Sequence, residues 1–533
     1  MSIRDNTPLK WALTSRKLYI SGRRLGSRVG YLRSLLTPNS KVKDTLLLIL
    51  ILTPFYFVSK VYFYTYPDEY YYIFTAIQLA EGRPITIQLD SSLLNLGFLV
   101  PTTIPNNYIS MYPIGQSLLI AIFYLIGGYR FMFYMNGFFA ILTVILTYLF
   151  ALEILGDRSC SLLGAFLLGI CPPIVFYSRT LLSDLPSTTF LLFSFFFYIK
   201  ASKKNSCLFY AISSLSLGFA TLLRYPNILF LIPILANQIR TRNFGELSTY
   251  FYYIPLIPFF FIHGLYNLYF FGSFFTTGYH LAGPAYHFSF ENLIMHLPLY
   301  FLILNIFPPL GLITTFLYTR KKLGEDAHYI IFFMILAFLV FYSFYSSLPI
   351  EIEHLFIEAT RFMLVILPYL CINTVMWFRS RIKTKNLFYV LLVVMFITFG
   401  ILNIAMISQY NAFKSRLVYY RDQFYTNTEP DSLIIGNDAW DKLFHPYFSR
   451  THGERYYLRY DRLSETEIIE ELLPFLDKWM DERPIYFIDD PYEAYADKNI
   501  HDFVLLVLIE NYKLDSVFAT DQPYTVELFK VSR

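Results

Sequence analysis

Long apolar stretches separated by short polar connections fill most of the first four hundred residues. A helix needs about 17 to 25 apolar residues to cross a bilayer. Eleven stretches come near that length, and they lie near 45–64, 131–155, 159–177, 185–199, 206–223, 225–239, 249–271, 297–318, 328–346, 361–378 and 387–408. The pattern predicts a polytopic α-helical membrane protein with about eleven transmembrane helices, spanning residues 44–409.

Basic residues fix the expected direction of these helices, because Lys and Arg concentrate in short cytoplasmic loops. Residues 1–43 carry ten Lys or Arg against one acid, Asp5, which predicts a cytoplasmic tail. Further basic clusters stand at 200–204, 240–242, 320–322 and 379–385. With eleven spans and the N-terminus inside, every cluster is cytoplasmic.

The stretch Pro113–Gly128 is also apolar, but counting it as a span would separate the N-terminal tail from all later basic clusters. We therefore expect it to lie in the membrane interface as a juxtamembrane helix. It then belongs to a long first outer loop, residues 66–130, together with a preceding amphipathic helix.

After residue 409 the apolar runs shorten and charges become frequent. Residues 432–436, 455–460, 485–489 and 524–531 are rich in strand-forming side chains, and 464–480 and 499–511 have helical spacing. Ser464 and Glu467 have the spacing of a capping box. Residues 410–533 therefore predict a small α/β domain on the extracytoplasmic side.

Composition agrees with a membrane protein and excludes several other classes. Hydrophobic residues make up 55% of the chain, charged residues 15%, and the net charge is +4. The basic residues follow the loops between apolar stretches, so no nucleic-acid partner is expected. The four cysteines lie in or beside apolar segments without the paired spacing of a metal or disulfide framework, and we interpret them as small buried residues.

Acidic residues stand at two outer ends of the predicted spans. Asp68 and Glu69 follow the first span and precede an amphipathic helix, so capping of that helix is one explanation for the pair. Asp184 lies in a short connection between two spans, where an ionisable group is costly and is usually paired or functional. Arg179 is an available partner for Asp184, and capping before Pro186 is the alternative.

Two arginines are expected on the same outer side. Arg224 follows one span and Arg361 opens another. Positive charge there runs against the usual bias and indicates an anionic partner, although an arginine that snorkels to lipid headgroups is the alternative. Acids and arginines at an outer interface suit transfer of a sugar from a polyprenyl phosphate, in which Arg binds the phosphate and a carboxylate takes the proton of an acceptor hydroxyl.

Five segments together resemble the GT-C superfamily of glycosyltransferases, in the branch of protein O-mannosyltransferases and bacterial aminoarabinose transferases. They are PDEYYYIFTAIQLAEGRP from Pro67, YPIGQSLLIAIFYLIGG from Tyr112, LLSDLP from Leu181, LLRYPNILFLIP from Leu222 and TRFMLVILPYL from Thr360. The resemblance covers roughly residues 45 to 380. It implies a GT-C fold, an inverting transfer, and a dolichyl- or undecaprenyl-phosphate sugar as the donor.

The resemblance also implies roles for single residues. Asp68 would be the general base, with Glu69 beside it and Asp184 near the same site, and Arg361 would lie at the donor phosphate. One departure is that Met111 and Tyr112 precede Pro113, where the aminoarabinose transferases have a lysine. That puts a lipid A acceptor in doubt and leaves phosphate binding to Arg361, Arg224 and Arg179.

Metal binding is not required by the sequence, although some members of the superfamily use a divalent cation. An outer loop holds His280, His287, His296 and Glu291, but their spacings differ from those of compact metal sites. We interpret this stretch as a loop facing the substrate.

The expected partners are an acceptor, which is a glycan, a protein or a lipid, and the membrane lipid around the chain.

Two other classes of function fit parts of the pattern. A transporter or flippase of a lipid-linked saccharide would also need many spans with charges inside the membrane, but transporters commonly contain repeats, and we find none here. A non-catalytic membrane subunit with an outer binding domain is the third possibility. Both leave the adjacent Asp68 and Glu69 without a role.

Overall fold

The computed structural model describes residues 40–58, 60–89, 99–241, 247–282, 288–345, 359–382, 384–437, 440–444, 455–490, 498–520 and 525–533. The chain divides into two compact units, Met1–Leu52 and Thr53–Arg533. The first unit contributes the N-terminal part of helix α2 (Ser40–Phe57). The second unit holds all the elements described below.

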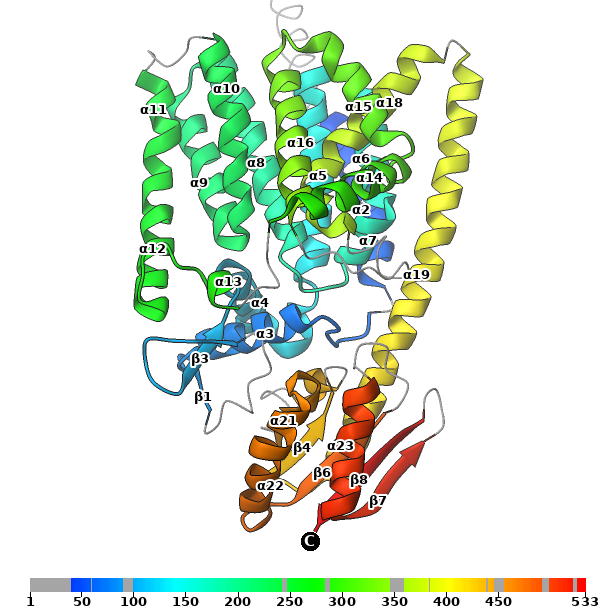
Figure 1. Ribbon diagram of the computed structural model, residues 1–533. Coiled ribbons are helices and arrows are strands. Elements are labelled where there is room, and N and C mark those ends of the chain that lie inside the picture. The colour runs from blue at the N-terminus through cyan, green and yellow to red at the C-terminus, as the bar shows by residue number, and fades with distance from the viewer. Residues whose placement is uncertain are drawn as a thin grey trace, which may run out of the picture. The chain divides into compact units, whose positions relative to one another are not determined.

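A helical bundle makes up most of the second unit (Figure 1). Its main helices are α5 (Met135–Leu155), α6 (Arg158–Ile170), α7 (Pro172–Tyr177), α8 (Asp184–Lys204), α9 (Cys207–Leu223), α10 (Leu231–Thr241), α11 (Leu247–Tyr253), α12 (Ile257–Phe271), α14 (Phe290–Ile306), α15 (Gly311–Thr319), α16 (Asp326–Phe344), α18 (Leu367–Arg381) and α19 (Lys385–Asn427). Helix α8 packs against α5 and α9, and α18 packs against α6 and α15.

Polar residues between the helices explain where several of them begin and end. Helix α5 ends at Gly156, which adopts the left-handed conformation that glycine allows. The next residue, Asp157, caps α6 by accepting a hydrogen bond from the backbone N–H of Cys160. Ser206 caps α9 in the same way. These short polar signals let neighbouring helices turn back on each other within one or two residues.

Six described helices are long and apolar enough to cross a membrane, or seven if one bent pair counts as a single span. That pair, α14 and α15, covers the stretch near 297–318 that the sequence predicts as one helix. The two helices are bent by 89° at the break. Pro308 and Pro309 lie at this break, and a proline removes a backbone donor and clashes with the preceding turn. The total of eleven spans stays a prediction.

The predicted first outer loop contains two helices and a small sheet. Helix α3 (Pro67–Ala80) packs along α4 (Gly115–Met132), and both lie at the lower end of the bundle in Figure 1. Strands β1 (Ile87–Gln88), β3 (Asn107–Ser110) and β2 (Leu99–Pro101) pair antiparallel in that order. Helix α4 is long and apolar enough for a span, so its interfacial location stays a prediction.

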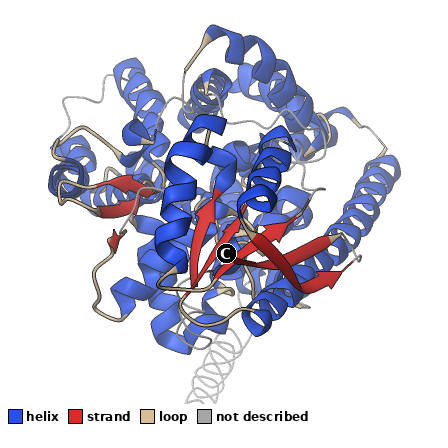
Figure 2. Ribbon diagram, turned by 60° about the horizontal axis from the view of Figure 1, so that its bottom comes forward, coloured by secondary structure: helices blue, strands red, loops and turns tan. Residues whose placement is uncertain are grey.

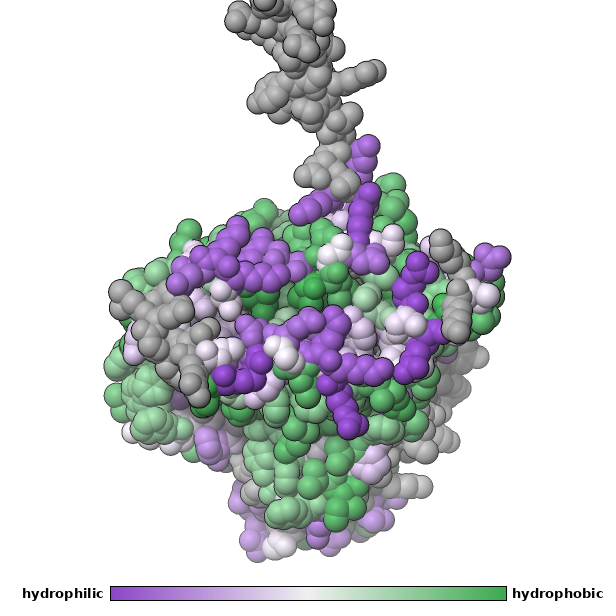
Figure 3. All heavy atoms as spheres, turned by 90° about the horizontal axis from the view of Figure 1, so that it is seen from above, coloured by the Kyte–Doolittle hydropathy of each residue, from purple (hydrophilic) through white to green (hydrophobic). Residues whose placement is uncertain are grey.

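Basic side chains gather at the opposite end of the bundle. The last turns of α8, α10 and α18 and the short helix η5 (Arg320–Lys322) carry them, namely Lys203, Lys204, Arg240, Arg379, Arg381, Arg320, Lys321 and Lys322. Figure 3 looks onto this end and shows hydrophilic patches among apolar ones. This is the end that the sequence predicts to be cytoplasmic.

The C-terminal part is an α/β domain built on a five-stranded sheet (Figure 2). The strand order is β5 (Arg455–Arg459), β4 (Ser432–Gly436), β6 (Ile485–Asp489), β8 (Val526–Ser532) and β7 (Lys513–Thr520). Strand β4 runs parallel to β5 and β6, and β8 runs antiparallel to β6 and β7. Helices α22 (Leu473–Met480) and α23 (Lys498–Asn511) contribute to its hydrophobic core.

The predicted fold class, a polytopic helical membrane protein with a small C-terminal α/β domain, is confirmed. The capping box is present, since Ser464 and Glu467 exchange hydrogen bonds. Strand β7 was not predicted. Helix α19 also runs through residues 409 and 410, where the sequence places the domain boundary, because a helix can continue after its apolar part ends.

Candidate active site

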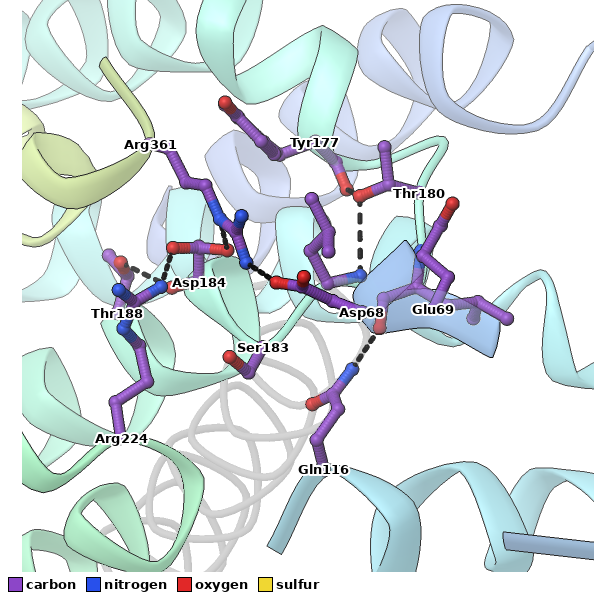
Figure 4. A network of polar contacts seen from close by, with 12 residues as sticks. Asp68, Glu69, Gln116, Tyr177, Thr180, Ser183, Asp184, Thr188, Arg224 and Arg361 are labelled. Atoms are coloured by element: carbon purple, nitrogen blue, oxygen red, sulfur yellow. Dashed lines mark hydrogen bonds and ion pairs between the residues drawn. The ribbon is translucent and has the colours of Figure 1, made fainter. Parts of the chain in front are cut away.

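Asp68, Asp184, Arg224 and Arg361 form one ion-paired cluster (Figure 4). Arg361 lies between the two acids: its Nε donates to Asp184 Oδ2 at 2.9 Å, and its Nη2 donates to Asp68 Oδ2. Arg224 donates through Nη1 to Asp184 Oδ1. Four residues that are distant in sequence therefore meet at one place, as their common outer position predicts.

Each member of the cluster stands at the end of a helix. Asp68 lies in the first turn of α3, and Asp184 is the first residue of α8. Arg224 is the C-cap of α9, and Arg361 lies in the helical turn before η6 (Leu364–Ile366). Carboxylates are favoured at helix N-termini, so the local fold supports both acids where they stand.

Both arginines keep hydrogen-bond donors for a further anion. Their side chains are 15% exposed, whereas the Asp184 side chain is 1% exposed. Within the described part of the chain, Arg224 Nε and Nη2 and Arg361 Nη1 donate no hydrogen bond. The Phe362 ring packs against both guanidinium groups. The arrangement can bind an anionic group in the planar, bidentate manner that arginine favours.

Tyrosines lie against the Asp68 side of the cluster. The Tyr112 hydroxyl donates to Asp68 Oδ1 at 2.6 Å. The Tyr72 and Tyr279 rings lie 5.2 and 5.9 Å from the Tyr112 ring. Burial raises the pKa of Tyr72 to about 12, and the Asp68 charge adds to this rise, so Tyr72 keeps its proton. In the sequence, Tyr112 stands out only as a departure from a family lysine, because nothing in its spacing points toward Asp68.

Comparisons with known proteins agree with this arrangement. Residues 112–263 match the family model of dolichyl-phosphate-mannose-protein mannosyltransferases. ArnT from Cupriavidus metallidurans in the apo state is similar in structure, with a TM-score of 0.57, 12% identity, and coverage of 92% of this chain and 98% of ArnT. This chain has the GT-C fold. The predicted resemblance to the GT-C superfamily, in its O-mannosyltransferase and ArnT-type branch, is thereby confirmed.

Two further structures share the GT-C fold with this chain. The ArnT structure with bound undecaprenyl phosphate matches with a TM-score of 0.55 and 11% identity over 91% of this chain and 97% of ArnT. The oligosaccharyltransferase of Archaeoglobus fulgidus matches with a TM-score of 0.54 and 11% identity over 91% of this chain and 74% of that enzyme. No curated protein matches the sequence.

Glu69 lies next to Asp68 but faces away from the arginines of the cluster. It is fully buried, and its Oε2 accepts the backbone N–H groups of Thr65 and Tyr66 at 2.8 and 3.1 Å. Its Oε1 accepts the backbone N–H of Leu181. Of the two adjacent acids, Glu69 thus caps α3 and joins it to the loop before α8, and only Asp68 faces the cluster. A catalytic role for Glu69 beside Asp68 stays a prediction.

Arg179 is not the partner of Asp184, contrary to the prediction. It donates to the backbone oxygens of Phe55 and Val58, both at 3.1 Å, and to Asn411 Oδ1 at 3.4 Å. The loop between α7 and α8 turns the side chain toward the end of α2, whose last carbonyls lack helical partners. Arg179 is 2% exposed there, and a phosphate-binding role for it stays a prediction.

The described residues of this cluster do not fit a divalent cation. All four carboxylate oxygens of Asp68 and Asp184 already accept hydrogen bonds from an arginine or from Tyr112. A cation there would have to replace Arg361 or face its charge. Elsewhere among the described residues, no three His, Cys, Asp or Glu side chains are grouped to hold a metal. His287, in the predicted outer loop, lies outside the described residues.

Proposed function

We propose that this chain is a membrane glycosyltransferase that moves a sugar from a polyprenyl-phosphate donor to an acceptor hydroxyl on the outer face of the membrane. The observation that best supports this function is the Arg361 bridge between Asp68 and Asp184, with Arg224 beside it. The cluster combines a carboxylate that can accept a proton with guanidinium donors that can hold a phosphate. The ArnT structure with undecaprenyl phosphate, which shares the fold, supports a donor of this class.

In this proposal the donor phosphate binds to the unused donors of Arg224 and Arg361. Asp184 holds both guanidiniums in place from its buried position. Its negative charge also offsets the repulsion between the two arginines. The lipid tail lies among the apolar helices. A donor that is already in the membrane needs no nucleotide-binding fold.

Asp68 serves as the general base. The acceptor hydroxyl attacks the anomeric carbon, the bond from that carbon to the phosphate oxygen breaks, and the hydroxyl proton passes to Asp68. The donor phosphate is a diester with one negative charge, and it leaves as a monoester with two. When Asp68 becomes neutral, Arg361 loses an ionic partner just as the leaving group gains charge, so its donors turn toward the phosphate. One displacement of this kind inverts the anomeric centre.

The decisive experiment compares wild type with Asp68→Asn in purified, nanodisc-embedded protein. Undecaprenyl phosphate serves as the binding probe, and synthetic undecaprenyl-phosphate mannose serves with other undecaprenyl-phosphate sugars as the donor panel. We expect the variant to bind undecaprenyl phosphate at least as tightly as wild type and to lose transfer by about 10²- to 10⁴-fold, the usual contribution of a general base. Asp515→Asn, on the exposed strand β7, is the matched control.

Two results would refute the proposal. Undiminished transfer by Asp68→Asn would remove the base, and a wild-type protein that does not bind undecaprenyl phosphate would remove the donor. Movement of an intact lipid-linked saccharide across the membrane without transfer would support the transporter alternative. Mass spectrometry of surface glycans and glycolipids from a deletion strain would then identify the sugar and its acceptor.

A further inference from the structure

A second buried polar cluster lies beside the acid–arginine site, in the loop of residues 178–183 between α7 and α8. Lys414 Nζ donates to the backbone oxygen of Arg179 at 3.1 Å. Lys60 Nζ donates to the backbone oxygen of Ser178 at 3.2 Å. Lys414 is 1% exposed and Arg179 is 2% exposed. Two lysines from distant elements thus hold two consecutive carbonyls of one short loop.

The rest of this loop is held in the same way. Gln116 Nε2 donates to the backbone oxygen of Leu181 at 2.6 Å, and Asn136 Nδ2 donates to that of Leu182 at 2.9 Å. Four carbonyls of the loop therefore accept hydrogen bonds from side chains of four separate segments. Such contacts fix the path of a backbone that has no regular structure of its own.

The loop ends at Asp184, which accepts both arginines of the proposed site. Arg179 lies five residues before it. Leu181 also donates its backbone N–H to Glu69, the neighbour of Asp68. The position of the 178–183 loop therefore decides where Asp184 stands relative to Asp68.

Helix α19 reaches this region with three side chains of one face. The hydroxyls of Tyr410 and Thr65 lie 2.9 Å apart, Asn411 accepts from Arg179, and Lys414 is one turn further along. The Lys414 ammonium lies 4.5 Å from the centre of the Tyr410 ring, a cation–π contact. Helix α19 thus contacts the segments that precede both acids.

Burial of an ammonium group costs free energy. Its desolvation is costly unless it is well paired, and an apolar side chain of similar length would pack at lower cost. In the described part of the chain, the only hydrogen bond of Lys414 goes to a carbonyl. The charge of the buried Glu69 carboxylate also favours this ammonium. Filling of space alone therefore does not account for a lysine at this position, whereas its hold on the loop that joins Glu69 to Asp184 does.

We propose that Lys414 is a positioning residue for sugar transfer. From α19 it holds the Arg179 carbonyl, and through the 178–183 loop it sets the Asp184 carboxylate that orients Arg224 and Arg361. This inference rests on the proposed function, but the contact itself can be tested without it.

The test uses the full chain in nanodiscs with three variants. Lys414→Met removes the charge and the donor at similar length, Lys414→Arg keeps a donor, and Arg416→Met removes a charge from the same helix as a control. We expect Lys414→Met to lower kcat about 10- to 100-fold with the donor KM within about twofold of wild type, the effect of a reacting geometry displaced by about 1 Å. Lys414→Arg should restore most of kcat, and Arg416→Met should leave it unchanged.

Hydrogen exchange of the peptide covering 178–187 provides the independent readout, since it needs no turnover. It should be about tenfold faster in Lys414→Met and close to wild type in the other two variants. Thermal unfolding should change little in Lys414→Met, because losing the carbonyl's donor and removing a buried charge act in opposite directions.

Unchanged loop exchange in Lys414→Met would overturn the inference, whatever the turnover. Faster exchange together with wild-type kcat would also overturn it, since the loop would then not set the reacting geometry. If the wild type transfers no sugar from any donor in the panel, the proposed function fails. The exchange measurement then still decides whether Lys414 fixes the loop.

Discussion

Asp184→Asn should affect phosphate binding and turnover differently. Asp184 itself does not touch the reacting atoms, but it pairs with the two arginines that would contact the donor phosphate. Its side chain is 1% exposed, and it accepts from Arg361 Nε at 2.9 Å and from Arg224. The substitution keeps the size of the side chain and removes its charge. Among the described residues, Arg361 then keeps one carboxylate partner, Asp68, and Arg224 keeps none.

The structure gives the sign and the size of three effects. Removing one partner of a buried ion pair costs about 3 kcal/mol of folding stability, at the low end of the usual range since both arginines are 15% exposed. A phosphate held by the same guanidiniums would lie about 7 Å from Asp184, so at an effective dielectric constant of about 20 the removal of the Asp184 charge favours each negative charge of the phosphate by about 2 kcal/mol. That corresponds to roughly 30-fold tighter binding per charge, so the binding of undecaprenyl phosphate, a monoester with up to two charges, should tighten at least 30-fold. Turnover should fall about 10²- to 10³-fold because the arginines lose their fixed orientation.

Titration with undecaprenyl phosphate and transfer assays on the same nanodisc preparation measure both quantities. They should be run well below the unfolding midpoint of the variant, with Asp515→Asn as the control. Weaker binding of undecaprenyl phosphate by folded Asp184→Asn would refute the reasoning, because it would mean that the arginines are not the anion site. An equal loss of binding and of turnover would also refute this reasoning.

Four other predictions test separate parts of the description. Arg224→Lys should weaken undecaprenyl phosphate binding about tenfold in the same titration, because an ammonium cannot offer two parallel donors; unchanged affinity would exclude this side chain from the site. Tyr112→Phe should lower kcat/KM about tenfold by removing one hydrogen bond to the proposed base, and a transfer assay that finds no loss would assign the phenol to packing. In intact cells and a cysteine-free background, a cysteine replacing Lys203 should escape an impermeant thiol reagent while one replacing Lys513 reacts, and the opposite pattern would reverse the predicted orientation. Ser464→Ala should reduce stability by about 1 kcal/mol in thermal unfolding of the full chain, since it removes the capping box, and an unchanged midpoint would contradict that value.

The sequence predicts the acid–arginine cluster because its members share an outer position and belong to segments with a family resemblance. Asp68, Asp184, Arg224 and Arg361 each stand at the end of an apolar helix, so topology alone places them on one side. Arg179 satisfies the same criterion and still faces elsewhere. Short connections can turn in several directions, and neither hydropathy nor spacing shows which way a loop side chain points.

Two errors of the fold prediction have different origins. The break between α14 and α15 could have been predicted, since Pro308 and Pro309 lie within the apolar stretch. Strand β7 was harder to recognise. It lies at the edge of the sheet, most of its side chains are exposed or half-buried, and it lacks the apolar alternation that marks a strand with one face in a core.

Helix α19 continues without interruption for 43 residues, and its far half contacts the sheet domain through Tyr420 and Trp440, whose rings lie 4.9 Å apart. Each residue inserted into a helix rotates all that follows by about 100° and shifts it by 1.5 Å. A single insertion between Lys414 and Tyr420 would therefore swing the sheet domain to another side of the molecule. In evolution, this stretch should tolerate length changes only near multiples of a whole turn.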